Sequence, residues 1–112
     1  MSIKNLYLYQ ANKTFMPPDL SDVFVNHNFP RNRFEVDLDD DHQAVLIYMI
    51  KAGLFVMLHT EVPPQFEGRG IAGKMAKEAL QFAAREGLKV RSYCTFTTRY
   101  IERHPEYHYL LG

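Results

Sequence analysis

Residues 60–74 read Thr-Glu-Val-Pro-Pro-Gln-Phe-Glu-Gly-Arg-Gly-Ile-Ala-Gly-Lys, and the rest of the chain is organised around them. An apolar run ends in this stretch, and an amphipathic helical pattern begins within it. Gly68, Gly70 and Gly73 leave the backbone unshielded beside the first turn of the predicted helix. The N–H groups of that turn have no partner within the helix and carry the positive end of its dipole. The stretch therefore predicts a cradle for an anion such as a phosphate.

Two general phosphate motifs fit these glycines only in part. The spacing within residues 68–73 matches the dinucleotide fingerprint, which needs a strand directly before it and an acidic residue at the end of the next strand. Pro63 and Pro64 interrupt the preceding strand, and the next predicted strand, residues 88–93, contains no acid. A Walker A loop needs Ser or Thr where Met75 stands. We exclude both motifs.

A third phosphate motif fits better. In the Gcn5-related N-acetyltransferases the acyl-CoA pyrophosphate loop has Gln or Arg, two variable residues, Gly, one variable residue, and then Gly or Ala. Residues 67–72, Glu-Gly-Arg-Gly-Ile-Ala, match it except at the first position. The flanking residues strengthen the match: His59-Thr60-Glu61-Val62-Pro63-Pro64, Cys94-x-Phe96, Tyr100-Ile101 and His104-Pro105-Glu106-Tyr107. From about Arg33 to Leu111 the chain resembles the small, single-domain, YjdJ-type branch of that superfamily.

The resemblance implies an α/β (α+β) fold with a mixed, mostly antiparallel sheet, a βαβ acetyl-CoA module and a short C-terminal helix. It also implies an N-acetyltransferase that uses acetyl-CoA as co-substrate and transfers the acetyl group directly to an amine. Two positions depart from the pattern: Glu67 replaces the usual Gln or Arg, and Ser92-Tyr93 stand where a proline is expected. The residues expected to bind CoA are Val62, Gly68, Arg69, Gly70, Ile71, Ala72, Gly73 and Lys74.

Acetyl transfer to an alkyl amine needs a base, because such an amine is almost wholly protonated at neutral pH. Glu61, at the end of its predicted strand and beside the expected cofactor gap, is the first candidate, and His59 is the second. The two are two residues apart, so they share one face of the strand. A solvent-facing strand end explains the same residues equally well. The expected oxyanion donor is a backbone N–H near Val62.

Cys94 follows the last predicted strand, where the thioester sulfur would arrive. It can return a proton to the CoA thiolate, or it can accept the acetyl group covalently. We favour the first role, because no histidine lies close to it in sequence. A buried free cysteine is also commonly an inert small hydrophobe. Tyr100 and Tyr107 are alternative proton donors.

Composition bounds the function. The 112 residues predict one domain spanning residues 1–112, with residues 1–29 as an N-terminal extension or an extra strand. Thirteen basic residues balance thirteen acidic ones, so we expect neither nucleic acid nor a membrane as partner. The single cysteine, and the absence of a signal pattern, predict a cytoplasmic protein. His104 and His108 are separated by Pro105, so we expect no metal site.

The acceptor amine, on a small molecule or a protein, is not specified by any motif, and we expect a monomer or a weak homodimer. Two other classes stay open. The chain can be an acyl-CoA-binding or regulatory module without turnover, which would bind acetyl-CoA but release no product. It can also be an interaction domain without a ligand, whose thermal stability CoA would not change.

The periodicity predicts the elements as follows. Residues 19–25 are expected to form a helical turn, and residues 34–38 an edge-like strand with one wet face. The apolar runs 44–50 and 54–58 are expected to be central antiparallel strands covered on both faces. A helix is expected over 71–86, closed by Gly87, then a parallel strand over 88–93. Thr97 or Thr98 is expected to cap a last short helix that Pro105 ends.

Overall fold

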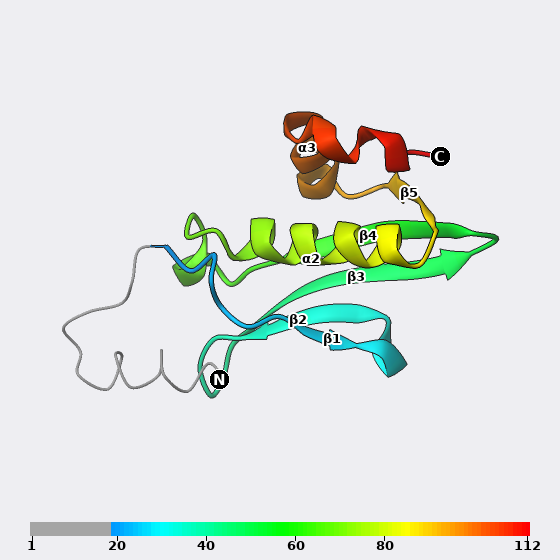
Figure 1. Cartoon of the computed structure of the whole chain (residues 1–112). Coiled ribbons are helices and arrows are strands. Elements are labelled where there is room, and N and C mark those ends of the chain that lie inside the picture. Colours follow the sequence, from blue (N-terminus) through cyan, green and yellow to red (C-terminus); the bar gives the residue numbers. More distant parts are fainter. Residues whose placement is uncertain (1–18) are drawn as a thin grey trace.

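A computed structural model describes residues 19–112 of the chain (Figure 1). They form a five-stranded sheet in the order β1-β2-β3-β4-β5, in which only the last pair is parallel. The strands are β1 (Asn26–Asn28), β2 (Arg33–Asp37), β3 (Gln43–Lys51), β4 (Leu54–Glu61) and β5 (Lys89–Ser92). The helices are α2 (Ile71–Arg85) and α3 (Thr95–Arg103), with the short 3-10 helices η1 (Phe29–Arg31), η2 (Pro64–Phe66) and η3 (Pro105–Leu110). The predicted mixed, mostly antiparallel α+β fold is confirmed.

Helix α2 crosses the sheet and supplies one side of the core (Figure 1). Its apolar residues recur every three or four positions, which places them on one face. Those buried are Ile71, Met75, Ala76, Ala79, Leu80, Phe82 and Ala83. The helix ends as predicted at Gly87, whose φ of +69° lets its N–H reach the Ala84 carbonyl while Leu88 N–H reaches that of Ala83. The chain then returns as β5, parallel to β4.

The sheet is covered on one face rather than on both. Phe34, Tyr48 and Phe55 face α2 and are at most 3% exposed. Met49 and Leu58, which were expected to be enclosed, are exposed. The expectation was wrong because α3 and η3 pack against α2 instead of supplying a second layer on the far side. Among residues 19–112 no helix is long and apolar enough to span a bilayer.

Strand β2 is not the edge strand that its alternation predicted. β1 pairs along its outer side and buries Glu35, which is only 7% exposed. The Glu35 carboxylate accepts hydrogen bonds from Arg33, from Asn28 at 2.9 Å and from Asn26 at 3.4 Å. Burial is the largest influence on the Glu35 pKa and raises it, but these bonds and the Arg33 charge together hold the pKa below its usual value.

The C-terminal helix begins earlier than expected. α3 starts at Thr95 with Cys94 at its N-cap, and the N–H of Thr98 donates to the Cys94 carbonyl at 2.9 Å. Thr97 is fully buried instead of capping. Residues 21–23 form a turn, where the sequence predicted a helical turn over residues 19–25. Of the predicted N-terminal extension or extra strand in residues 1–29, residues 1–18 lie outside the described residues, and β1 (Asn26–Asn28) lies within the remainder.

Candidate functional site

A bulge in β4 decides which side chains face α2. Ile47 pairs with His59 and Tyr48 pairs with Met57, so Leu58 between them is the extra residue. Paired residues of antiparallel strands share a face, and Thr60 pairs with Leu46, a core residue beneath α2. The bulge therefore turns Thr60 toward α2 and turns its neighbours His59 and Glu61 to the other face.

β4 and β5 separate at the bulge. Their parallel pairing ends with Met57 and Ser92, followed by one hydrogen bond from Tyr93 N–H to the Met57 carbonyl at 2.9 Å. β4 continues to Glu61, whereas the segment after β5 turns into α3. The last residues of β4 thus have no β5 residue beside them. An extended ligand with amide groups can pair with such an edge as an added strand does.

Residues 67–70, here called the glycine loop, lead into α2 above this opening. Gly70 is the N-cap of α2 with φ of +92°, a backbone conformation that residues with a Cβ rarely adopt. The N–H of Leu20 donates to the Arg69 carbonyl at 2.5 Å. A Cβ at Gly70 would lie 3.1 Å from the Ser21 Cβ. Leu20 and Ser21 therefore support the loop from below, a role for which their sequence carried no signal.

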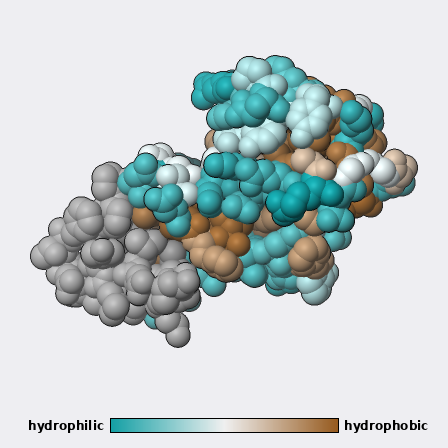
Figure 2. Space-filling view, viewed as in Figure 1, coloured by the Kyte–Doolittle hydropathy of each residue, from teal (hydrophilic) through white to brown (hydrophobic). Residues whose placement is uncertain are grey.

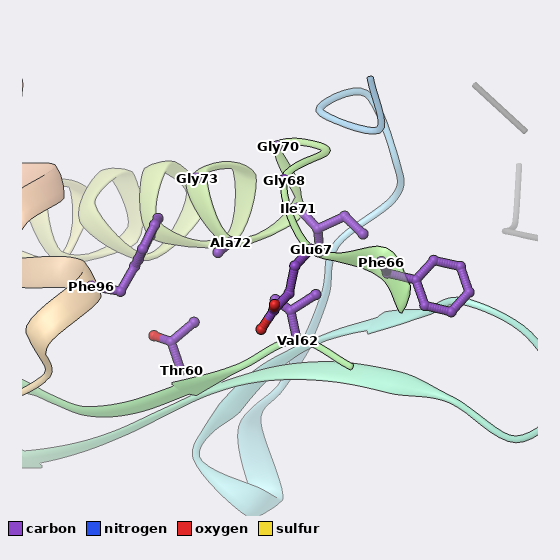
Figure 3. Close-up of a pocket in the computed structure, with 10 residues that line it drawn as sticks. All are labelled: Thr60, Val62, Phe66, Glu67, Gly68, Gly70, Ile71, Ala72, Gly73 and Phe96. Atoms are coloured by element: carbon purple, nitrogen blue, oxygen red, sulfur yellow. The ribbon is translucent and has the colours of Figure 1, made fainter. Parts of the chain in front are cut away.

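A hollow of about 480 Å³ lies between the loop, α2 and β4 (Figure 3). Thr60 on β4 and Val62 just after it point toward α2, Ala72 points from α2 toward β4, and Phe96 reaches in from α3 (Figure 3). Volumes of this size are typical of sites for small molecules and cofactors. The residues that line it are Thr60, Val62, Phe66, Glu67, Gly68, Gly70, Ile71, Ala72, Gly73 and Phe96.

Two basic residues predicted to bind CoA lie outside this lining. Arg69 is the only residue among those described with a buried side-chain nitrogen, Nη1, that lacks a hydrogen-bond partner. An orphaned buried donor is costly, so a ligand that accepts from it gains affinity. The Lys74 ammonium lies 3.4 Å from the Glu78 carboxylate on the outer side of α2, where the surface is hydrophilic (Figure 2). The glycine loop at the start of α2 is the kind of site that binds an anionic phosphate.

A second hollow of about 570 Å³ shares Thr60 and Phe96 with the first. It also contains Cys94 and His59, two of the positions that sequence motifs singled out, and it meets the first hollow at one end. The residues that line it are Leu58, His59, Thr60, Tyr93, Cys94, Thr95, Phe96 and Arg99. The two shared residues mark the place where the hollows meet.

Cys94 is 8% exposed, and its Sγ lies 3.4 Å from the Thr60 Oγ1 across the parting strands. Burial is the largest influence on the thiol and raises its pKa. Hydrogen bonds between the thiol and Thr60 and Thr97, and one with the Phe96 N–H, oppose burial and hold the Cys94 pKa below its usual value. The position at the start of α3 acts in the same direction, because a helix N-terminus stabilises a thiolate.

The other predicted catalytic residues are placed differently. His59 lines the second hollow, and its Nε2 lies 3.7 Å from the Glu61 carboxylate. Glu61, the first candidate base, is strongly exposed and lines neither hollow. Tyr100 lies against Gly73 and stacks on His104 with ring centroids 3.9 Å apart. Its pKa is raised, first by burial and then by Tyr107 and Glu106.

Comparison with known proteins agrees with this geometry. A family model described as GCN5-related N-acetyl-transferase matches residues 33–110. Protein NATD1 of Homo sapiens is 41% identical over 90 residues, which cover 79% of this chain and 80% of that protein. Protein NATD1 of Xenopus tropicalis is 40% identical over 92 residues, which cover 80% of this chain and 84% of that protein.

A solved structure shows the same fold. The solution structure of a GCN5-like protein from Staphylococcus aureus superposes with a TM-score of 0.66. The match covers 83% of this chain and 91% of that chain, at 21% sequence identity. At that identity the similarity establishes the arrangement of helices and strands.

Proposed function

This chain belongs to the GCN5-related N-acetyltransferase family, and we propose that it transfers an acetyl group from acetyl-CoA to an amine. The observation that carries the proposal is the opening between β4 and β5, with the glycine loop at one end and Cys94 at the other. Such an opening offers an extended, amide-containing arm a path from a phosphate cradle to a thiol-lined hollow.

The loop residues bind and orient the co-substrate. Backbone N–H groups at the start of α2 face the pyrophosphate, and Arg69 supplies the charge that Glu67 at the usual Gln or Arg position lacks. Val62 contributes the backbone N–H for the developing oxyanion. Ala72 leaves space between α2 and β4. The remaining predicted residue, Lys74, contributes positive charge near the loop without lining the hollow.

Acetyl-CoA supplies a thioester, whose carbonyl carbon bonds to the amine nitrogen as its carbon–sulfur bond breaks. His59 in the second hollow removes the proton that makes the amine an ammonium, and Glu61 lies beside the His59 ring. The N–H proton that the nitrogen loses once its bond to the carbonyl carbon has formed passes to solvent. Cys94 gives its thiol proton to the departing sulfur and regains one from solvent. The products are then an N-acetyl amine and free CoA thiol. The acetyl group passes directly from the thioester to the amine, without a covalent intermediate on Cys94.

A substitution at Ala72 tests the binding half of this proposal. Glutamate near the start of a helix is favourable for the dipole, so Ala72→Glu should fold normally. It also brings a carboxylate and added volume to the position where the pyrophosphate would approach. We expect calorimetry to show CoA affinity reduced about tenfold or more, which corresponds to roughly 1.4 kcal/mol. Ala72→Ser, which adds almost no volume and no charge, should bind as the natural protein does.

Product formation tests the catalytic half. Free CoA thiol released from acetyl-CoA across a panel of amines, with acetylated product seen by mass spectrometry, is the expected result. Tight binding without transfer to any amine would favour the acyl-CoA-binding module instead. Equal CoA affinity for Ala72→Glu and Ala72→Ser would contradict the proposed cofactor site.

A further inference from the structure

Thr60 occupies the junction between the two hollows. It lines both of them, and its hydroxyl lies 3.4 Å from the only thiol in the chain. The contact crosses from the end of β4 to the start of α3, two segments that no backbone pairing joins at this level. Phe96, the other shared residue, is apolar and offers no hydrogen bond from its side chain to the sulfur.

We propose that Thr60 is the positioning residue for Cys94: its hydroxyl holds the sulfur at the junction and supports the thiolate when the thiol has lost its proton. The inference rests on the proposed function only for the role of Cys94 as proton donor to the departing sulfur. The sequence motifs assign no role to Thr60, which lies between the two candidate bases and on the opposite face of β4.

A hydroxyl suits this task because it can reverse its hydrogen bond. While Cys94 is a thiol, its S–H donates to Thr60 Oγ1, as the structure shows. When the S–H bond breaks and the proton moves to the departing sulfur, the Thr60 O–H can rotate and donate to the new thiolate. Hydrogen bonds to a charged acceptor are the stronger kind, so the hydroxyl favours the thiolate.

The Ser92 hydroxyl acts on the backbone of Cys94, whereas Thr97, like Thr60, also hydrogen-bonds the thiol. Ser92 Oγ donates to the Cys94 carbonyl at 3.1 Å, and it also contacts the hydroxyls of Thr97 and Thr98. Ser92 is therefore a matched control, since its loss removes a neighbouring hydroxyl without removing one that touches sulfur.

Several titratable groups share the hollows around the thiol. His59 from β4, Tyr93 just after β5 and Arg99 from α3 line the second hollow. Glu102 from α3 lines a third hollow of about 300 Å³, which also contains Cys94. All four remain in every variant compared below. Differences between those variants in the pH dependence of Cys94 therefore report on Thr60 and not on these neighbours.

The test measures alkylation of Cys94 by iodoacetamide as a function of pH in the ligand-free protein, where a single cysteine makes the signal unambiguous. Thr60→Val keeps the shape of the side chain and removes the hydroxyl. We expect its reactivity midpoint to rise by about one pH unit, which is about a tenfold loss of thiolate at neutral pH. Thr60→Ser keeps a hydroxyl and should have the same midpoint as the natural protein. Ser92→Ala, the control, should leave the midpoint unchanged.

Two outcomes would overturn the proposal. A midpoint in Thr60→Val equal to that of the natural protein would show that the hydroxyl does not support the thiolate. A midpoint in Thr60→Ser equal to that of Thr60→Val would show that the methyl group, not the hydroxyl, matters. Thermal melting of each variant establishes that it is folded, and Thr60→Ala serves where valine prevents folding.

The result is separable from the proposed activity. A shifted midpoint together with no acetyl transfer by the natural protein would support the Thr60 contact and reject the enzyme. Acetyl transfer with an unshifted midpoint would support the enzyme and reject the contact. If both hold, Thr60→Val should lower kcat more than it changes KM for acetyl-CoA, and the serine variant should recover kcat.

Discussion

The N–H of Leu20 donates a 2.5 Å hydrogen bond to the carbonyl of Arg69, which ties the start of the described chain to the glycine loop. Leu20 is 2% exposed and packs in the core, while the family match begins only at residue 33. A segment outside the matched region thus forms the underside of the candidate cofactor loop. The hydrogen bond holds the Arg69 carbonyl in place at the entry to α2.

Leu20→Ala keeps the N–H that bonds the loop but removes the buried side chain that fixes this N–H in place, so it should weaken CoA binding as well as folding. Loss of a buried leucine side chain costs roughly 2–5 kcal/mol of unfolding free energy. Urea unfolding checks that loss, and calorimetry at a temperature where the variant is folded checks affinity. Val23→Ala removes a nearby buried side chain without touching the loop bond, so it should lower stability but leave CoA affinity unchanged. Equal loss of affinity in both variants would argue against the supporting role.

Gly70 and Gly73 should respond oppositely to alanine. In Gly70→Ala the alanine would have to adopt the left-handed conformation of Gly70, which costs about 1–2 kcal/mol. Its Cβ would also press on Ser21. Gly73→Ala lies inside α2, where its Cβ would meet Tyr100 at an ordinary 3.6 Å. Alanine there should raise stability by about 0.5–1 kcal/mol. Chemical denaturation of the two variants checks the signs, and a stabilised Gly70→Ala would contradict the described loop.

Arg69→Met should barely change stability in the absence of ligand, because the substitution removes a buried nitrogen that has no partner among the described residues. CoA affinity should fall, and the deficit should shrink as salt screens the lost charge. Calorimetry at low and high ionic strength tests this. Equal affinity at low salt would mean that Arg69 does not contact the phosphates.

Glu35 should make folding sensitive to acid. Its pKa in the folded protein lies below the ordinary value of 4.5, so the unfolded chain binds a proton first as the pH falls. The stabilisation is fully present above pH 4.5 and is lost as the pH drops through the lower folded value. Glu35→Gln should flatten the decline in unfolding free energy over that acid range. Denaturant titrations at several pH values measure it, and parallel curves for both proteins would contradict the buried network.

Local patterns carried much of the fold. The spacing of Ile71, Met75 and Ala79 determined α2, and Gly87 determined its end, because helix faces and helix caps depend on neighbours a few residues away. The glycine loop and Cys94 were visible as motifs for the same reason. The far end of α3 was also readable, since Pro105 cannot continue a helix.

Only the tertiary structure decided which strand residues face the site. Alternation from Met57 would have put His59 and Glu61 beneath α2, but the Leu58 bulge inserts one residue and brings Thr60 there instead. No local signal announces the bulge, because it exists only in the pairing of β4 with β3. The burial of Glu35 by β1 and the Thr60–Cys94 contact are likewise long-range. The sequence by itself therefore determined α2 and the glycine-rich entry to it, whereas strand pairing decided how the side chains around the thiol are arranged.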